Sequence, residues 1–182
     1  QPAEARGLGG FIGNYGELTA VGGDMELTRS GRLVELRPPL GAPPYAISGP
    51  TDYLERWGRY DVGRFLQDTT FSPDFPSVAR VWEEVYPQTP GGAPLDGVIM
   101  VDPYALAALM TFTGPITVPG YDVPLTSENA ADILLREQYL AFEDEGGQRV
   151  DFLDDVTRLT FEALTNGDLP SPREVADVLQ PV

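Results

Sequence analysis

A proline- and glycine-rich segment at residues 38–50 constrains the fold more than any other feature of the sequence. It contains Pro38-Pro39, Pro43-Pro44 and Gly49-Pro50. Proline has no backbone donor, so this segment cannot form a central strand. We expect a surface loop here, and loops of this length in compact domains are often functional or mobile. Strand-like runs precede the loop, and a weak helical pattern follows it from Thr51 and Asp52 to Trp57.

Three short runs before this loop have the pattern of strands. They cover residues 17–21, 25–29 and 33–37, and Gly22-Gly23-Asp24 and Ser30-Gly31 separate them. Such spacing predicts a β-meander of three strands.

Two helices are predicted to begin at an aspartate close to a proline, at Asp74 and at Asp102. Aspartate is a favoured N-cap, and proline suits the first helical turn. The helix that begins at Asp74 is predicted to have one apolar face, formed by Val78, Val81, Trp82 and Val85. Between these helices, residues 97–101 are a continuous apolar run, as in a buried strand. Residues 116–118 have the pattern of another short strand.

The end of the chain has helical patterns. We expect helices over residues 126–142 and from 150 to about 166, and a last helix opened by the capping box Ser171-Pro172-Arg173-Glu174. The alternation of strands and helices after residue 70 predicts an α/β fold, a three-layer α/β/α sandwich with a mixed central sheet. The chain fits a single domain over residues 1–182.

The chain contains no lysine, histidine or cysteine. Schiff-base and P-loop lysine chemistry, Ser-His-Asp and Cys-His nucleophiles and zinc hydrolase sites are therefore excluded. The remaining polar chemistry belongs to arginine, carboxylates and hydroxyls.

The net charge of −16 argues against nucleic acid and anionic membrane surfaces as general partners. A lysine-free, acidic composition is also typical of a GC-rich or salt-tolerant source. No apolar run approaches the roughly 20 residues that span a bilayer. Because the sequence begins with Gln1, we expect an excised piece of a longer protein, and any signal or anchor would lie upstream of it.

Several candidate site residues each have a structural alternative. The opening Arg6-x-x-Gly9-Gly10-x-x-Gly13 would let the backbone and an arginine approach a phosphate, or its glycines serve bulges at a strand start. Asp74 and Asp102 are candidate metal ligands, or N-caps only. Arg136 and Arg149 are candidate phosphate ligands, or members of surface ion pairs.

Seven motifs follow one another in order along the chain. They are Ala-Glu-Ala-Arg-Gly-x-Gly-Gly-Phe-Ile-Gly at 3–13, Ser-Pro-Asp-Phe-Pro at 72–76, Asp-Gly-Val at 96–98, Val-Asp-Pro at 101–103, Thr-Gly-Pro at 113–115, Val-Pro-Gly at 118–120 and the helix at 129–139. This ordered set resembles a bacterial envelope family, the domain of unknown function four-thousand-and-twelve. Its members typically look like single-pass membrane proteins with this domain outside the cell, so the resemblance implies an extracytoplasmic location and a membrane anchor upstream of the chain.

Arg6, Arg37, Asp102, Gly114-Pro115-Ile116 and Arg149 fall in an order that is similar to that of a second family. This fainter similarity is to the LytR-CpsA-Psr family, which transfers undecaprenyl-pyrophosphate-linked glycopolymers to peptidoglycan. The resemblance implies a LytR-CpsA-Psr-like fold, arginines around the pyrophosphate and Mg²⁺ on Asp74 or Asp102. The sequence departs from that family where glycine replaces the carboxylate expected after the first arginine, and where Pro38-Pro39 follow Arg37.

The sequence leaves two functions open. In the first, Arg6, Arg37, Arg149 and, more weakly, Arg136 bind a polyprenyl-phosphate or glycan-phosphate in envelope glycopolymer assembly. That function includes a glycopolymer ligase, although its expected acidic positions are missing. In the second, the chain is a non-catalytic envelope module that binds a glycan or a protein partner. A purely structural domain is a third reading.

Overall fold

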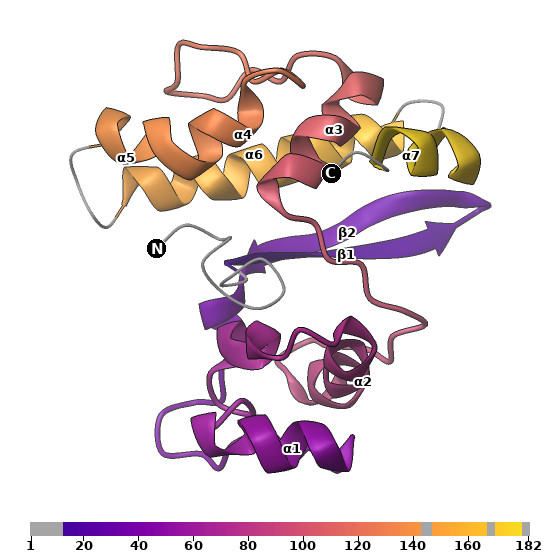
Figure 1. The fold of residues 1–182 in the computed structure, drawn as a ribbon, viewed down its shortest axis with the longest axis vertical. Helices are drawn as coiled ribbons and strands as arrows, with labels where there is room; N and C mark the ends of the chain where they lie inside the picture. The colour runs from indigo at the N-terminus through magenta and orange to yellow at the C-terminus, as the bar shows by residue number, and fades with distance from the viewer. Residues whose placement is uncertain (1–12, 143–146, 167–169, 180–182) are drawn as a thin grey trace. The chain divides into compact units, whose positions relative to one another are not determined.

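A computed structural model describes residues 13–142, 147–166 and 170–179. The described residues combine helices with one two-stranded antiparallel sheet (Figure 1). The predicted α/β class is confirmed in this coarse form. The three-layer sandwich is not confirmed, because the only strands that pair into a sheet in the described ranges are β1 (Asn14–Val21) and β2 (Asp24–Arg32).

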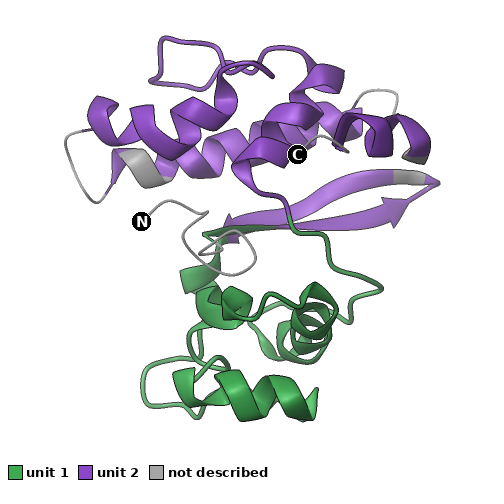
Figure 2. Cartoon of the chain, in the orientation of Figure 1, with its two compact units in different colours: residues 1–15, 32–100 green, residues 16–31, 101–182 purple. Residues whose placement is uncertain are grey.

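The chain divides into two compact units (Figure 2). Unit 1 comprises residues 1–15 and 32–100, and unit 2 comprises residues 16–31 and 101–182. This division does not test the single domain expected over residues 1–182, which stays a prediction.

Unit 1 consists of short helical segments around a core of aliphatic and aromatic side chains. On the predicted helix, Val78, Val81, Trp82 and Val85 are all buried, which confirms the apolar face. The elements of unit 1 in chain order are η2 (Leu33–Leu36), α1 (Thr51–Trp57), η3 (Gly58–Tyr60), η4 (Leu66–Phe71), α2 (Phe75–Val85) and η5 (Tyr86–Gln88).

The third strand of the predicted meander is wrong. Residues 33–36 form the 3₁₀ turn η2, in which Leu33 and Leu36 are both buried. Side chains three residues apart lie on the same side of a 3₁₀ turn, so this conformation buries both leucines. A strand would have placed them on opposite faces.

The buried strand predicted at residues 97–101 is also wrong. This segment has no regular secondary structure, and Ile99 is 78% exposed. Val98 packs against the core of unit 1 and Val101 against the core of unit 2. The apolar run therefore belongs to the passage of the chain from one unit to the next.

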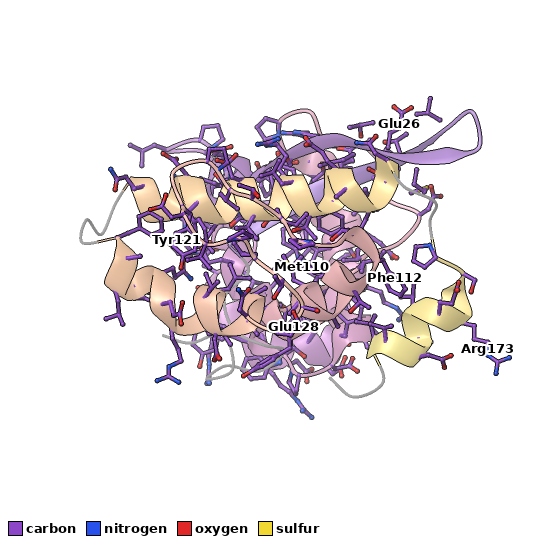
Figure 3. All side chains as sticks on the ribbon, turned by 90° about the horizontal axis from the view of Figure 1, so that it is seen from above. Glu26, Met110, Phe112, Tyr121, Glu128 and Arg173 are labelled. Carbon is purple, nitrogen blue, oxygen red and sulfur yellow. The ribbon has the colours of Figure 1, made fainter. Side chains whose placement is uncertain are left out.

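Unit 2 combines the β1–β2 hairpin with helices around an aliphatic core. In Figure 3, Met110 lies among the side chains at the middle of the unit, whereas Glu26 and Arg173 lie at its outside. The short strand expected at residues 116–118 is reduced to one bridge between Ile116 and Leu125. The helical elements of unit 2 are α3 (Pro103–Thr113), α4 (Ala130–Asp132), η6 (a π-helical turn, Ile133–Glu137), α5 (Gln138–Ala141), α6 (Gln148–Asn166) and α7 (Pro172–Leu179).

The predicted proline-rich loop at 38–50 has neither helix nor strand. Side chains at the end of α2 and in η5 hold the loop in place through hydrogen bonds. The Gln88 amide accepts from Ala46 N at 2.9 Å and donates to Ala46 O at 2.8 Å. The Glu84 carboxylate accepts from Ser48 N at 2.6 Å and from its hydroxyl at 2.9 Å. Gln88 thus pairs with Ala46 as the backbone of a neighbouring strand would.

Candidate functional site

The described part of unit 1 contains a pocket of about 100 Å³ where α1 faces the beginning of α2. It brings together two segments that are distant in sequence, one turn of α1 and the Ser72-Pro73-Asp74 motif. Its lining residues are Asp52, Tyr53, Arg56, Trp57, Ser72, Pro73, Asp74 and Ser77.

Asp74 occupies the N-cap of α2, as predicted. Its carboxylate accepts a hydrogen bond from Ser77 N at 3.1 Å and another from the Ser77 hydroxyl. The Ser72 hydroxyl accepts from Asp74 N at 3.2 Å. These bonds satisfy a free donor of the first helical turn and fix the motif at the rim of the pocket.

Asp52 and Arg56 come from one side of α1, four residues apart. Both are exposed, and this spacing suits an ion pair on a helix. No ion pair or hydrogen bond joins their side chains to any residue in the described ranges. A carboxylate and a guanidinium therefore line the pocket, and neither is paired with another side chain of the described residues.

The base of the pocket is held by a buried hydrogen-bond network. The Tyr53 hydroxyl donates to Thr69 O at 2.8 Å, and Trp82 Nε1 donates to Thr69 Oγ1 at 3.0 Å. Thr69 Oγ1 in turn donates to Leu66 O at 2.8 Å. Burial, and then the nearby negative charge of Asp68, strongly raise the pKa of Tyr53. Tyr53 is therefore a protonated structural donor and does not act as a base at neutral pH.

An aromatic cluster continues from the pocket through Trp57. The Trp57 ring stacks at 6.2 Å on Tyr60 and at 6.3 Å on Phe71, with interplanar angles of 29° and 27°. Tyr60 and Phe71 also contact each other at 4.9 Å.

The structure does not gather the four predicted phosphate-binding arginines into one described site. Arg6 lies outside the described residues, as does the side chain of Arg149, whose backbone belongs to α6 in unit 2. Arg37 lies in unit 1, with its guanidinium 5.4 Å from the centre of the Phe65 ring. Arg136 is exposed in η6 of unit 2. Their role in phosphate binding stays a prediction.

The two predicted metal ligands are both N-caps and lie in different units. The Asp102 carboxylate accepts from Ala105 N at 2.7 Å at the start of α3 in unit 2, whereas Asp74 lies in unit 1. Within the ranges that the structure describes, no three carboxylates gather as a metal site requires. The capping alternative is confirmed for both residues.

Sequence reasoning missed Asp52 and Arg56. The spacing of these two residues was visible in the sequence, but it is typical of an ordinary surface ion pair. Only the packing of α1 against the Ser72-Pro73-Asp74 motif shows that they line a pocket.

The chain matches the family described as "Protein of unknown function (DUF4012)" over residues 1–139. The chain belongs to this family. The DUF4012 match includes every residue that lines the pocket. Comparison with curated proteins and with solved structures found no match. Among the described residues of this DUF4012 chain, no helix is both long and apolar enough to span a membrane.

Proposed function

We propose that this DUF4012 chain is a non-catalytic module of the bacterial cell envelope that binds a glycan in the pocket of unit 1. The observation that carries the proposal is the pocket lining, in which Asp52 and Arg56 lie beside the half-buried ring of Trp57 and have no side-chain partner among the residues that the structure describes. The envelope location comes from the family resemblance and is part of the proposal.

The chemistry of the lining supports a sugar. Neighbouring hydroxyls of a sugar both donate and accept hydrogen bonds, which suits a carboxylate acceptor beside a guanidinium donor. An indole offers an apolar face to the C–H side of a sugar ring. The two carboxylates, Asp52 and Asp74, disfavour an isolated phosphate in the same pocket, because only Arg56 among the lining residues is cationic.

The size of the pocket supports binding rather than catalysis on a lipid-linked substrate. Pockets that enclose a drug-sized molecule have volumes of roughly 300–1,000 Å³. A pocket of about 100 Å³ holds the polar edge of one sugar ring and leaves the rest outside. The Asp74 carboxylate also accepts the hydrogen bonds from Ser77 that cap α2. A carboxylate held in this way is better suited to accepting a hydrogen bond from a ligand than to transferring a proton.

The phosphate-binding function is a second candidate, favoured by Arg37. Its Nε is buried without a hydrogen-bond partner in the described part of the chain, and a buried donor of this kind calls for an acceptor. In this alternative Arg37 binds the phosphate of a polyprenyl-phosphate or glycan-phosphate, with Mg²⁺ reducing the charge. The expected roles of Arg6, Arg136 and Arg149 in phosphate binding belong to the same alternative. The three-layer LytR-CpsA-Psr-like fold and the membrane anchor belong to the same proposal.

The decisive experiment follows backbone amide shifts of the ¹⁵N-labelled chain by NMR. The probes are the methyl glycosides of glucose, galactose, mannose and N-acetylglucosamine at millimolar concentration, and geranyl pyrophosphate with and without Mg²⁺. We expect a glycoside to shift the amides around Asp52 and Arg56 saturably. If no glycoside moves these amides, the glycan function is wrong, and magnesium-dependent shifts near Arg37 with geranyl pyrophosphate would favour the second candidate.

Two substitutions in the pocket have matched controls on the surface of unit 1. Asp52→Asn and Arg56→Gln should each weaken glycoside binding about tenfold, because a hydrogen bond to a charged group contributes about 1.5–3 kcal/mol. Glu55→Gln on α1 and Arg80→Gln on α2 remove the same charges from exposed residues outside the lining. These control variants should bind as the wild type does.

A further inference from the structure

We infer that the sugar bound in the pocket of unit 1 is an amino sugar, in which a protonated amine takes the place of one ring hydroxyl. The inference rests on the proposed glycan function, and it names the class of sugar that the pocket selects. It is drawn from the charges of the lining. Asp52 and Asp74 are acidic, whereas Arg56 is the one basic residue among the lining residues of the described chain.

Asp52 supplies one acceptor for an ammonium group. It is exposed on α1, and no ion pair or hydrogen bond joins its side chain to another residue in the described ranges. A sugar hydroxyl can donate a hydrogen bond to this carboxylate. An ammonium group donates the same bond and adds the attraction between two opposite charges. The Asp52 carboxylate therefore favours the amine over the hydroxyl.

Asp74 supplies a second acceptor at the rim of the pocket. The Ser77 amide and the Ser77 hydroxyl both donate to the same oxygen, Oδ2 of Asp74. The other oxygen, Oδ1, accepts no hydrogen bond from the part of the chain that the structure describes. Because the Arg56 guanidinium offsets only one of the two carboxylates, the lining as a whole favours a cation.

The surroundings of the pocket add to its negative potential. Tyr53 lines the pocket, and the negative charge of Asp68 acts with burial to raise the pKa of the Tyr53 hydroxyl. The Asp68 charge therefore lies close to the wall of the pocket, whereas the protonated Tyr53 carries none. At longer range, the net charge of −16 attracts cations to the chain.

The lining also contains donors for the uncharged part of a sugar. Ser72 is 4% exposed, and its hydroxyl accepts from Asp74 N at 3.2 Å. The proton of this hydroxyl has no acceptor within the described ranges. Together with the Arg56 guanidinium, it can donate to a ring oxygen or to a sugar hydroxyl. An amino sugar uses both these donors and the carboxylates, whereas a simple ammonium ion uses the carboxylates alone.

The test compares sugars that differ only in the amine. Calorimetry and amide shifts are measured with methyl glucosaminide against methyl glucoside, and with methyl galactosaminide against methyl galactoside. We expect one amino glycoside to bind about 3- to 10-fold more tightly than its parent glycoside, the range of one or two exposed ion pairs. This affinity ratio should fall in 1 M NaCl, where the Debye length is about 3 Å.

Substitutions in the lining should move the affinity ratio in opposite directions. Asp52→Asn removes a negative charge and should bring the ratio toward 1, even though it weakens the binding of both sugars. Arg56→Gln removes the positive charge and should raise the ratio, because it no longer repels the amine. A general loss of pocket structure cannot produce both changes. Glu55→Gln removes a negative charge from α1 outside the lining and should leave the ratio unchanged.

The outcomes distinguish this inference from the function on which it rests. Equal affinity for the amino glycosides and their parents, or a ratio that Asp52→Asn does not change, overturns the selection of an amino sugar and leaves the glycan pocket standing. Nα-acetyl-lysine amide carries an ammonium group without a sugar. If it binds as tightly as the amino glycosides, the selection of an amino sugar is also wrong. Absence of binding by every glycoside overturns both the inference and the glycan function.

Discussion

In unit 1 the buried hydroxyl of Thr69 accepts a hydrogen bond from Trp82 Nε1 and donates one to Leu66 O. It therefore links η4, which contains Thr69 and Leu66, to α2, which contains Trp82. In unit 2 the buried hydroxyl of Thr160 donates to Val156 O, one turn earlier on its own helix. Both threonines are fully buried. The first hydroxyl therefore supports tertiary structure, whereas the second adds a bond inside a helix that is already formed.

The same contrast extends through the two units. Helices such as α3 and α6 in unit 2 bury aliphatic side chains around Met110. Apart from α2, the helical segments of unit 1 have at most seven residues, and side chains such as Gln88 and Tyr53 complete the hydrogen bonding of this unit. Regular helices need few such bonds, because their backbone groups are paired internally. Irregular backbone leaves polar side chains in fixed positions, and the candidate site lies in that unit.

The largest expected effect is in unit 2, where Met110→Ala should lower the free energy of unfolding by about 2–5 kcal/mol. Met110 is 1% exposed and its loss leaves a cavity in an aliphatic core. Leu140, 84% exposed, is the control, since Leu140→Ala should change stability by less than about 0.5 kcal/mol. Chemical denaturation followed by circular dichroism measures both, and equal effects would show that apolar burial does not hold unit 2 together.

The next effect tests the two threonines directly. Thr69→Val should destabilise the protein by about 1–3 kcal/mol, because the buried Trp82 donor loses its acceptor. Thr160→Val should cost less than about 0.5 kcal/mol, since the Val156 carbonyl still lies within a continuous helix. Denaturation midpoints of the two variants measure these losses of stability. If Thr69→Val and Thr160→Val lower the free energy of unfolding equally, the contrast between the units is wrong.

A smaller effect is expected where Gln88 fastens the proline-rich loop. Gln88→Ala should reduce stability by about 1 kcal/mol, because the hydrogen bonds to Ala46 are exposed. Hydrogen exchange at the Ala46 amide should become faster in this variant. The Gln88→Glu variant keeps an acceptor for the Ala46 amide and should partly protect that amide from exchange. If exchange at Ala46 is unchanged in Gln88→Ala, other contacts hold the loop.

The smallest effect depends on pH and concerns α7 in unit 2. Hydrogen bonding to the side chain and backbone of Ser171 lowers the pKa of Glu174. A lowered pKa in the folded state means that the ionised carboxylate stabilises the helix above its ordinary pKa, and that this contribution is lost as the pH falls through the lowered value. NMR titration should show this low pKa, and Ser171→Ala should return it toward the ordinary range. A wild-type Glu174 that titrates in the ordinary range would contradict the capping box.

Features that depend on a few neighbouring residues could be predicted from the sequence. The caps at Asp74 and Asp102 are confirmed, as are the apolar face of α2 and the capping box of Ser171 and Glu174. In each case the donor and the acceptor lie within one turn of each other, so local spacing determines the bond.

Features that depend on tertiary packing could not be predicted. Leu33 and Leu36 leave the strand pattern because both are buried in the core of unit 1. Asp52 and Arg56 have the spacing of a surface pair and become pocket residues through the packing of α1. Propensity and periodicity describe one segment at a time and contain no information on which other segment it meets.

The hairpin at residues 16–31 belongs to unit 2, although the chain on both sides of it belongs to unit 1. Neither unit is therefore a continuous stretch of polypeptide. A gene fragment ending at residue 100 encodes unit 1 together with strands that lack their helices, and a fragment beginning at residue 101 encodes helices that lack their strands. A single continuous stretch of coding sequence therefore cannot transfer either unit alone to another protein, and recombination must transfer both units together.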